Sequence, residues 1–72
     1  MEKDMAKAMG RPAHVLTFEE AVDVWLKRWD GWIQSRIAAH YDTNQGRVSE
    51  VLSEDLHPGS RTEAERRRGR AA

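Results

Sequence analysis

Residues 34–52 read QSRIAAHYDTNQGRVSEVL, and this stretch decides the fold. Apolar side chains recur through it at steps of three and four, the spacing of one buried face on a helix. Two sets of apolar residues follow this spacing. The first begins at Ile33, one residue before the quoted stretch, and continues with Ile37, Ala38 and Tyr41; the second is Val48, Val51 and Leu52. Between them Asp42 and Asn44 favour a short turn, because both residue types tolerate left-handed backbone and hydrogen-bond it locally. We therefore expect two short helices, at about 32–41 and 45–53, with Thr43 or Asn44 capping the second.

A capping box marks the start of a further helix upstream. The Thr17 hydroxyl can accept a backbone N–H at the helix start, and Glu20, three residues on, can reach back. Apolar residues again follow at helical spacing: Phe18, Ala21, Val22, Trp25, Leu26 and Trp29. Gly31 ends this helix after Asp30. No strand pattern competes, so the expected fold class is all-α, with a core of three helices.

The two ends of the chain differ from this core. Residues 1–14 are expected to form a flexible N-terminal arm, because Gly10 and Pro12 interrupt a weak helical pattern. The ordered domain then spans 15–57. Residues 58–72 form a basic tail that we expect to be disordered, with at most a brief helix, because nothing apolar would hold it to the core.

Composition excludes several classes of function. At 72 residues and 8.3 kDa the chain is one small domain, and domains of this size rarely enclose a catalytic pocket. The absence of cysteine excludes disulfides, cysteine-ligated zinc and thiol chemistry, and indicates a reducing, cytoplasmic compartment. The sequence has no long apolar run, so we expect no membrane span and no signal peptide. The three histidines lie on different elements, so we expect no metal site, no cofactor and no enzymatic activity.

The net charge of the whole chain is zero, but its charged residues are unevenly distributed along the sequence. Residues 15–56 carry four cations against eight acids, residues 1–14 have a net charge of +1, and residues 57–72 have a net charge of +3. An acidic middle is unusual for a protein that binds DNA, because DNA-binding faces are usually basic. The distribution therefore keeps a protein partner open as an alternative.

Residues 34–52 resemble the helix-turn-helix of bacterial and phage transcription regulators, and are similar to the lambdoid-repressor type. Ala38 stands where the two helices cross, and only a small side chain there lets the backbones approach. The family usually has glycine at the position of Asp42, which needs positive φ, and an apolar residue at the position of Thr43. Both departures weaken the match, although Asp tolerates positive φ at some cost.

The resemblance implies that residues 45–53 form a recognition helix that enters the major groove by its N-terminal end. Its outward residues would be Asn44, Gln45, Gly46, Ser49, Glu50 and Ser53. Gln45 is the strongest candidate for base reading, because a glutamine amide can pair bidentately with adenine. The glutamine at Gln34 would contact a phosphate and brace Gln45, and the glycine at Gly46 would let the helix approach the bases.

The remaining candidates have competing interpretations. Arg47 is one step off the reading face and could reach a guanine or a phosphate. Glu50 could accept from cytosine but would otherwise repel DNA, and both Glu50 and Ser53 could simply be solvated. Further phosphate contacts are expected from three arginines of the tail, with a solvated tail as the alternative: Arg66, Arg67 and Arg68.

Trp25, Trp29 and Trp32 lie four and three residues apart. Trp25 and Trp29 fit a helical core, but three indoles exceed what so small a core can hide, so we expect the tryptophans to form a dimer interface, with Trp32 the strongest candidate. A role as stacking platforms for nucleic-acid bases is disfavoured, because acids rather than basic residues flank them.

The sequence thus predicts a site-specific, double-stranded-DNA-binding protein, a homodimeric transcriptional repressor of bacterial or phage type. The alternative is a protein-interaction module on the same scaffold, which binds a partner protein through its acidic, tryptophan-rich first helix. A third reading, an accessory protein in recombination or partition, shares the DNA chemistry.

Overall fold

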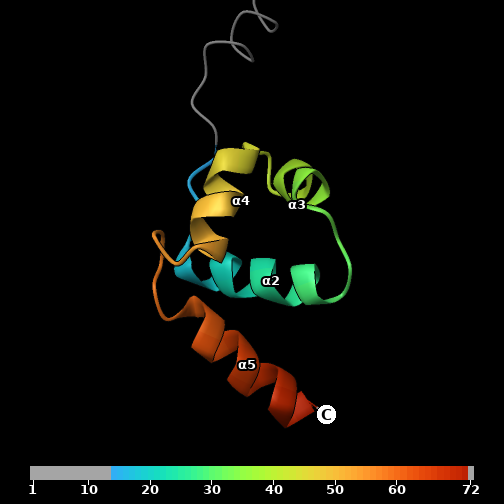
Figure 1. Cartoon of the computed structure of the whole chain (residues 1–72), viewed down its shortest axis with the longest axis vertical. Helices are drawn as coiled ribbons and strands as arrows, with labels where there is room; N and C mark the ends of the chain where they lie inside the picture. The colour runs from blue at the N-terminus through green and yellow to red at the C-terminus, as the bar shows by residue number, and fades with distance from the viewer. Residues whose placement is uncertain (1–13, 72) are drawn as a thin grey trace, which may run out of the picture.

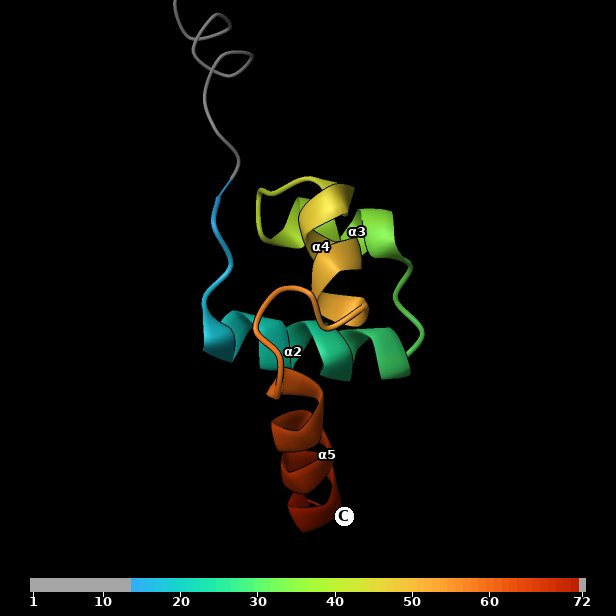
Figure 2. The ribbon, with the colours of Figure 1, turned by 60° about the vertical axis from the view of Figure 1, so that its left-hand side comes forward.

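The computed structural model describes residues 14–71, and within this range it contains four helices and no strand (Figure 1). The helices are α2 (Phe18–Trp29), α3 (Gln34–His40), α4 (Gln45–Leu52) and α5 (Ser60–Ala71). Helix α2 lies in the middle, with α3 and α4 on one side and α5 on the other (Figures 1 and 2). The expected all-α class is confirmed for these residues, whereas the arm expected at 1–14 falls, except for His14, outside them.

The start and end of α2 agree with the sequence. The Glu20 N–H donates to Thr17 Oγ1 at 3.1 Å, and the Thr17 N–H donates to Glu20 Oε1 at 2.9 Å, which completes the capping box. The helix ends at Trp29, with Asp30 as its C-cap, and Gly31 follows with a φ of +101°. Only glycine adopts such a conformation freely, so the chain can turn there towards α3.

The core takes side chains from all four helices. It consists of Leu16, Ala21, Val22, Val24, Trp25, Ile37, Ala38, Val48, Val51 and Ala64. Two expected core residues are exposed instead: Phe18 at 39% and Ile33 at 60%. Phe18 is the first residue of α2, and Ile33 precedes α3 as its extended N-cap, so neither lies on a helical face that is covered. Val24 is buried although the pattern did not predict it, because α2 is covered on two sides rather than along one stripe.

A four-residue connection, Tyr41–Asn44, joins α3 to α4. Asp42 takes a φ of +54°, the left-handed conformation that usually calls for glycine. The Thr43 hydroxyl donates a hydrogen bond to the His14 carbonyl at 2.8 Å. Threonine at this position, where the family usually has an apolar residue, therefore holds the segment that precedes α2 against the turn. Asn44 is the N-cap of α4, and its amide oxygen accepts from the Arg47 N–H at 3.0 Å.

The expectation of a disordered tail is wrong, because residues Ser60–Ala71 form a helix that packs on α2. Ala64 is completely buried, and the buried Ser60 hydroxyl accepts a hydrogen bond from Trp25 Nε1 at 3.1 Å. Arginines of α5 add further contacts, because their guanidinium groups lie over the indoles of α2 or pair with its acids. Arginine can therefore replace the missing apolar side chains, and the domain does not end at residue 57.

None of the helices in residues 14–71 combines the length and apolar character needed to cross a membrane.

Candidate nucleic-acid interface

Helix α4 is held to the core by one side and exposes the other. Val48 and Val51 are completely buried, whereas Gln45, Arg47 and Ser49 are exposed. The side chain of Gln45 makes no hydrogen bond with any described residue, so its amide is available to a ligand. The N-terminal half of α4 therefore presents polar side chains from a backbone that packing fixes in place.

Asn44, one of the two expected caps, is the N-cap of α4, and the structure shows that Gly46 packs against this cap. The Asn44 amide oxygen accepts the capping hydrogen bond from Arg47 N–H, and its amino group makes no hydrogen bond with a described residue. A Cβ built at Gly46 would lie 3.0 Å from that same oxygen. Glycine at this position therefore makes room for the cap, whether or not it also allows close approach to a ligand.

Arg47 and Glu50 form an ion pair, with Arg47 Nη1 donating to Glu50 Oε1 at 2.6 Å. Both side chains are nearly half exposed, so the pair is weak and can open for another anion. Ser53 lies at the opposite end of α4, where its hydroxyl is within hydrogen-bonding distance of the Glu50 carbonyl and of Asp55. Two helical turns separate it from Gln45, about 12 Å along the axis, so the structure does not bring these two residues together.

Gln34 begins α3 and is half-buried. No hydrogen bond joins its side chain to Gln45 in residues 14–71. The brace that the resemblance implies is therefore not formed in the free chain. Arg36, two residues further along α3, is exposed and was not among the expected contacts, although its place on the outward side of the same helix could have indicated it.

The arginines of α5 do not join this surface. Figures 1 and 2 show α5 on the side of α2 opposite to α3 and to the N-terminal end of α4. Arg66 pairs with Glu63, and Arg67 pairs with both Glu63 and Glu19, its contacts to Glu19 measuring 2.9 Å. The hydrogen bonds that Arg67 donates to the carboxylates of Glu19 and Glu63 raise its pKa. The tail arginines thus lie outside the α4 surface, and Arg67 ties α5 to α2.

The three tryptophans have different surroundings. Trp25 is only 7% exposed and is covered by α5, so its expected place in a dimer interface is wrong for the folded chain. Trp29 packs against Trp25 with ring centroids 5.7 Å apart and is half-buried. Trp32 lies at the corner before α3, with the Lys27 ammonium 4.9 Å and the Arg36 guanidinium 5.7 Å from its ring centroid. Only Trp32 stays beside an exposed apolar residue, Ile33.

The acids of α2 are paired within the chain. Glu20 contacts His14 at 2.7 Å, and Asp23 accepts hydrogen bonds from Lys27, at 2.8 Å, and from the Tyr41 hydroxyl. Burial would raise the pKa of Asp23, but the hydrogen bonds from Lys27 and Tyr41 outweigh it and lower the pKa. Burial and the same bond to Asp23 raise the pKa of Tyr41 above its ordinary value. These carboxylates are therefore ionised and engaged near neutral pH.

Comparison of the chain with models of protein families, with curated proteins and with solved structures gave no match.

Proposed function

We propose that this protein binds double-stranded DNA at specific sites through α4 and acts as a transcriptional repressor. One observation supports the proposal above the others: a four-residue connection with left-handed Asp42 leads into a capped helix whose N-terminal half is polar and exposed. A helix-turn-helix uses this arrangement to insert its second helix into the major groove, N-terminal end first.

Base reading is assigned to the exposed side of α4. Gln45, at the first position of the helix, has a free amide that suits the N6 and N7 edge of adenine. Ser49 follows one turn later on the same side and can donate or accept. Arg47 would exchange Glu50 for a phosphate or for guanine, a change that its exposed, weak ion pair permits.

Few phosphate contacts are available to this surface. On α3 and α4 the exposed cations are Arg36 and Arg47, and Glu50 opposes the second of them. Each phosphate contact lowers the logarithm of the DNA-binding constant by about 0.9 for every tenfold rise in salt. About two contacts per protomer therefore predict a shallow salt dependence. Recognition would therefore depend on base contacts and on dimerisation more than on charge.

A second copy would supply the contacts that one unit lacks. Three or four base-reading side chains specify too short a site, and two-fold symmetry doubles it with half-sites about 34 Å apart. The corner formed by Trp32 and Ile33 is the apolar surface best suited to this role, because α5 already covers Trp25. A groove of about 440 Å³ lies there, lined by Asp30, Gly31, Trp32, Ile33 and Arg36.

In the competing interpretation the protein is a protein-interaction module, which requires the acids and tryptophans of α2 to be accessible to a partner protein. Glu19, Glu20 and Asp23 are already paired within the chain, and α5 covers Trp25. A partner could reach this surface only after α5 had moved. An accessory role in recombination or partition would use the same α4 surface, so it differs in pathway and not in chemistry.

Selection of binding sites from a pool of random duplexes at 150 mM salt tests the proposal. The expected result is one enriched, two-fold symmetric sequence with half-sites one helical turn apart. Enrichment of no sequence, together with binding that every competitor duplex displaces equally, would contradict it.

A further inference from the structure

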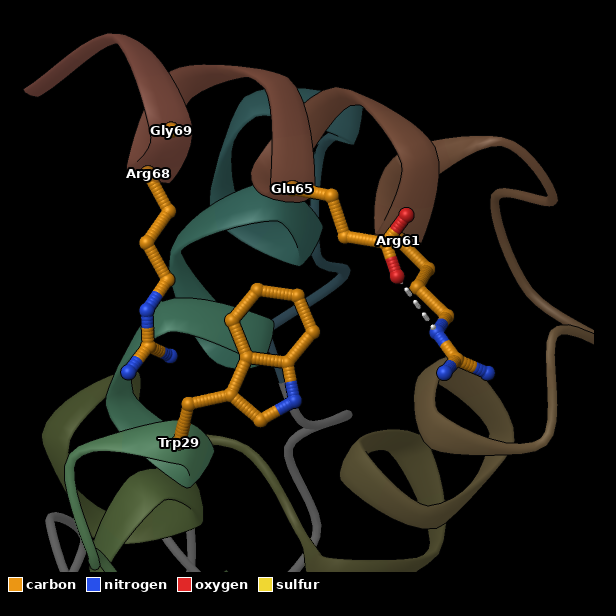
Figure 3. Close-up of a pocket in the computed structure, with 5 residues that line it drawn as sticks. All are labelled: Trp29, Arg61, Glu65, Arg68 and Gly69. Carbon is orange, nitrogen blue, oxygen red and sulfur yellow. Dashed lines mark hydrogen bonds and ion pairs between the residues drawn. The ribbon is translucent and has the colours of Figure 1, made fainter. Parts of the chain in front are cut away.

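A second surface lies on the far side of α2 from α4. It is a groove of about 530 Å³ between α2 and α5, lined by Trp29, Arg61, Glu65, Arg68 and Gly69 (Figure 3). Its volume falls in the range of sites that hold one small organic molecule. The groove is open to solvent, and none of its residues belongs to the α4 surface.

The groove places an indole between two guanidinium groups. Figure 3 shows Trp29 in the middle, with Arg68 on one side and the pair Arg61–Glu65 on the other. The Arg68 guanidinium lies 5.3 Å from the Trp29 ring centroid. The acids next to the tryptophans in the sequence disfavour a stacking platform. In the folded chain, however, α5 lies on α2 and brings basic side chains to both sides of Trp29.

The charges in the groove are unequal. Arg61 Nε donates to Glu65 Oε2 at 3.2 Å, so these two groups largely neutralise each other. Arg68 makes no ion pair with any residue in the described part of the chain. Its guanidinium is the free cation of the groove and can bind an anionic oxygen through two parallel N–H donors.

Gly69 leaves space beside this cation. A Cβ built at Gly69 would meet no heavy atom within 4 Å. The Trp29 ring nitrogen points towards the Arg61 side of the groove and donates to no described residue. An aromatic surface, an unused N–H donor and an unpaired guanidinium thus converge on unfilled volume.

The geometry points to a binding site for a nucleotide unit, with its base stacked on Trp29 and its phosphate on Arg68. Indoles stack on any nucleobase, and an adjacent arginine adds charge and cation–π attraction. A carboxylate ligand without a ring would leave Trp29 unused, and a neutral ring would leave Arg68 unused. The unit can come from a free mononucleotide or from a single strand of nucleic acid, which share this chemistry.

The test is a titration of the full chain, followed by the indole Nε1–H resonances of its three tryptophans in ¹H–¹⁵N NMR spectra. The probes are adenosine monophosphate, adenosine and a single-stranded oligothymidylate. We expect saturable movement of the Trp29 resonance, with the Trp32 resonance unmoved, and weaker binding of adenosine than of its monophosphate. Movement with the monophosphate identifies a free nucleotide as a sufficient ligand, and movement with the oligonucleotide alone identifies the strand.

Arg68→Gln should weaken the binding of the phosphate-bearing probe about tenfold or more, because it removes a charge-assisted contact. Arg66→Gln is the matched control, since Arg66 is also an exposed arginine of α5 but does not line the groove. Gly69→Leu adds a side chain at the edge of the groove and improves helix propensity, so it should block binding without unfolding α5.

No saturable movement of the Trp29 resonance with any probe would overturn the assignment. Equal weakening by Arg68→Gln and Arg66→Gln, or unchanged binding in Gly69→Leu, would overturn it too. The α4 proposal stands apart from these outcomes, because Gln45→Ala leaves this groove unchanged.

Discussion

Asn44 links the turn to the stability of α4. Its amide oxygen satisfies one of the backbone N–H groups that a helix start leaves without a partner, at a distance of 3.0 Å from Arg47 N. Asn44→Ala should lower the free energy of unfolding by about 1 kcal/mol. Urea denaturation measures this loss, and Asn44→Ser, which keeps a capping oxygen, should recover most of it. An alanine variant as stable as the parent chain would show that the cap contributes nothing.

Asp23 and Tyr41 join α2 to the end of α3 through a partly buried hydrogen bond. Tyr41→Phe removes the donor from an ionised carboxylate, and should cost about 1–2 kcal/mol at pH 7. The folded chain holds the pKa of Asp23 below its ordinary value, so this stabilisation is present above the unfolded pKa of about 3.9 and is lost as the pH falls through the folded pKa.

The difference in stability between the parent chain and Tyr41→Phe should therefore shrink as the pH is lowered below about 4. Thermal unfolding at a series of pH values measures it. A difference that stays constant from pH 7 to pH 2 would show that the Asp23 carboxylate is not the partner that matters.

At the scale of elements, the attachment of α5 depends on arginines that cross to α2. Arg67 bridges Glu63 of its own helix and Glu19 of α2, whereas Arg66 contacts only Glu63. Arg67→Ala should therefore speed amide hydrogen exchange in α5 and lower the melting temperature more than Arg66→Ala, its matched control. Raised salt should reduce the difference, because the ion pair between Arg67 and Glu19 is open to solvent. Equal exchange in the two variants would show that the bridge to Glu19 does not hold α5 on α2.

Local signals explain how much of the fold could be predicted. The capping box fixed the start of α2, and the spacing of Ile37, Ala38, Val48 and Val51 fixed the buried sides of α3 and α4. Helix α5 could not be predicted in this way, because its partners are far away in sequence. Ser60 contacts Trp25, and Arg67 contacts Glu19 across 48 positions.

The candidate site was predictable to the same extent. Helical spacing identified the exposed residues of α4 correctly, including Gln45 and Ser49. It did not identify the close approach of Gly46 to the Asn44 cap, nor the absence of a bond between Gln34 and Gln45. Those features depend on how α3, the turn and α4 meet, and the pattern of apolar residues does not encode that geometry.

For the whole molecule, the proposed dimer requires Trp32 and Ile33 to meet a second copy. Trp32→Ala should shift the protein towards monomer and weaken operator binding, because it removes apolar area worth roughly 25 cal/mol per Å². Sedimentation equilibrium at tens of micromolar measures the shift. Val15→Ala is the control, since Val15 is 73% exposed but lies outside this corner. A parent chain that is monomeric, or a Trp32→Ala variant that stays dimeric, would reject this interface.

The central claim is that α4 reads base pairs, and the affinity of Gln45→Ala for DNA tests it most directly. Fluorescence anisotropy gives the affinity for the selected duplex and for a scrambled duplex of the same composition. We predict a loss of about 1–3 kcal/mol on the selected site and no change on the scrambled one, because Gln45 contacts bases and not phosphates. Thr62→Ala, an exposed change on α5, should leave both affinities unchanged. Equal losses on both duplexes, or no loss on either, would contradict the claim.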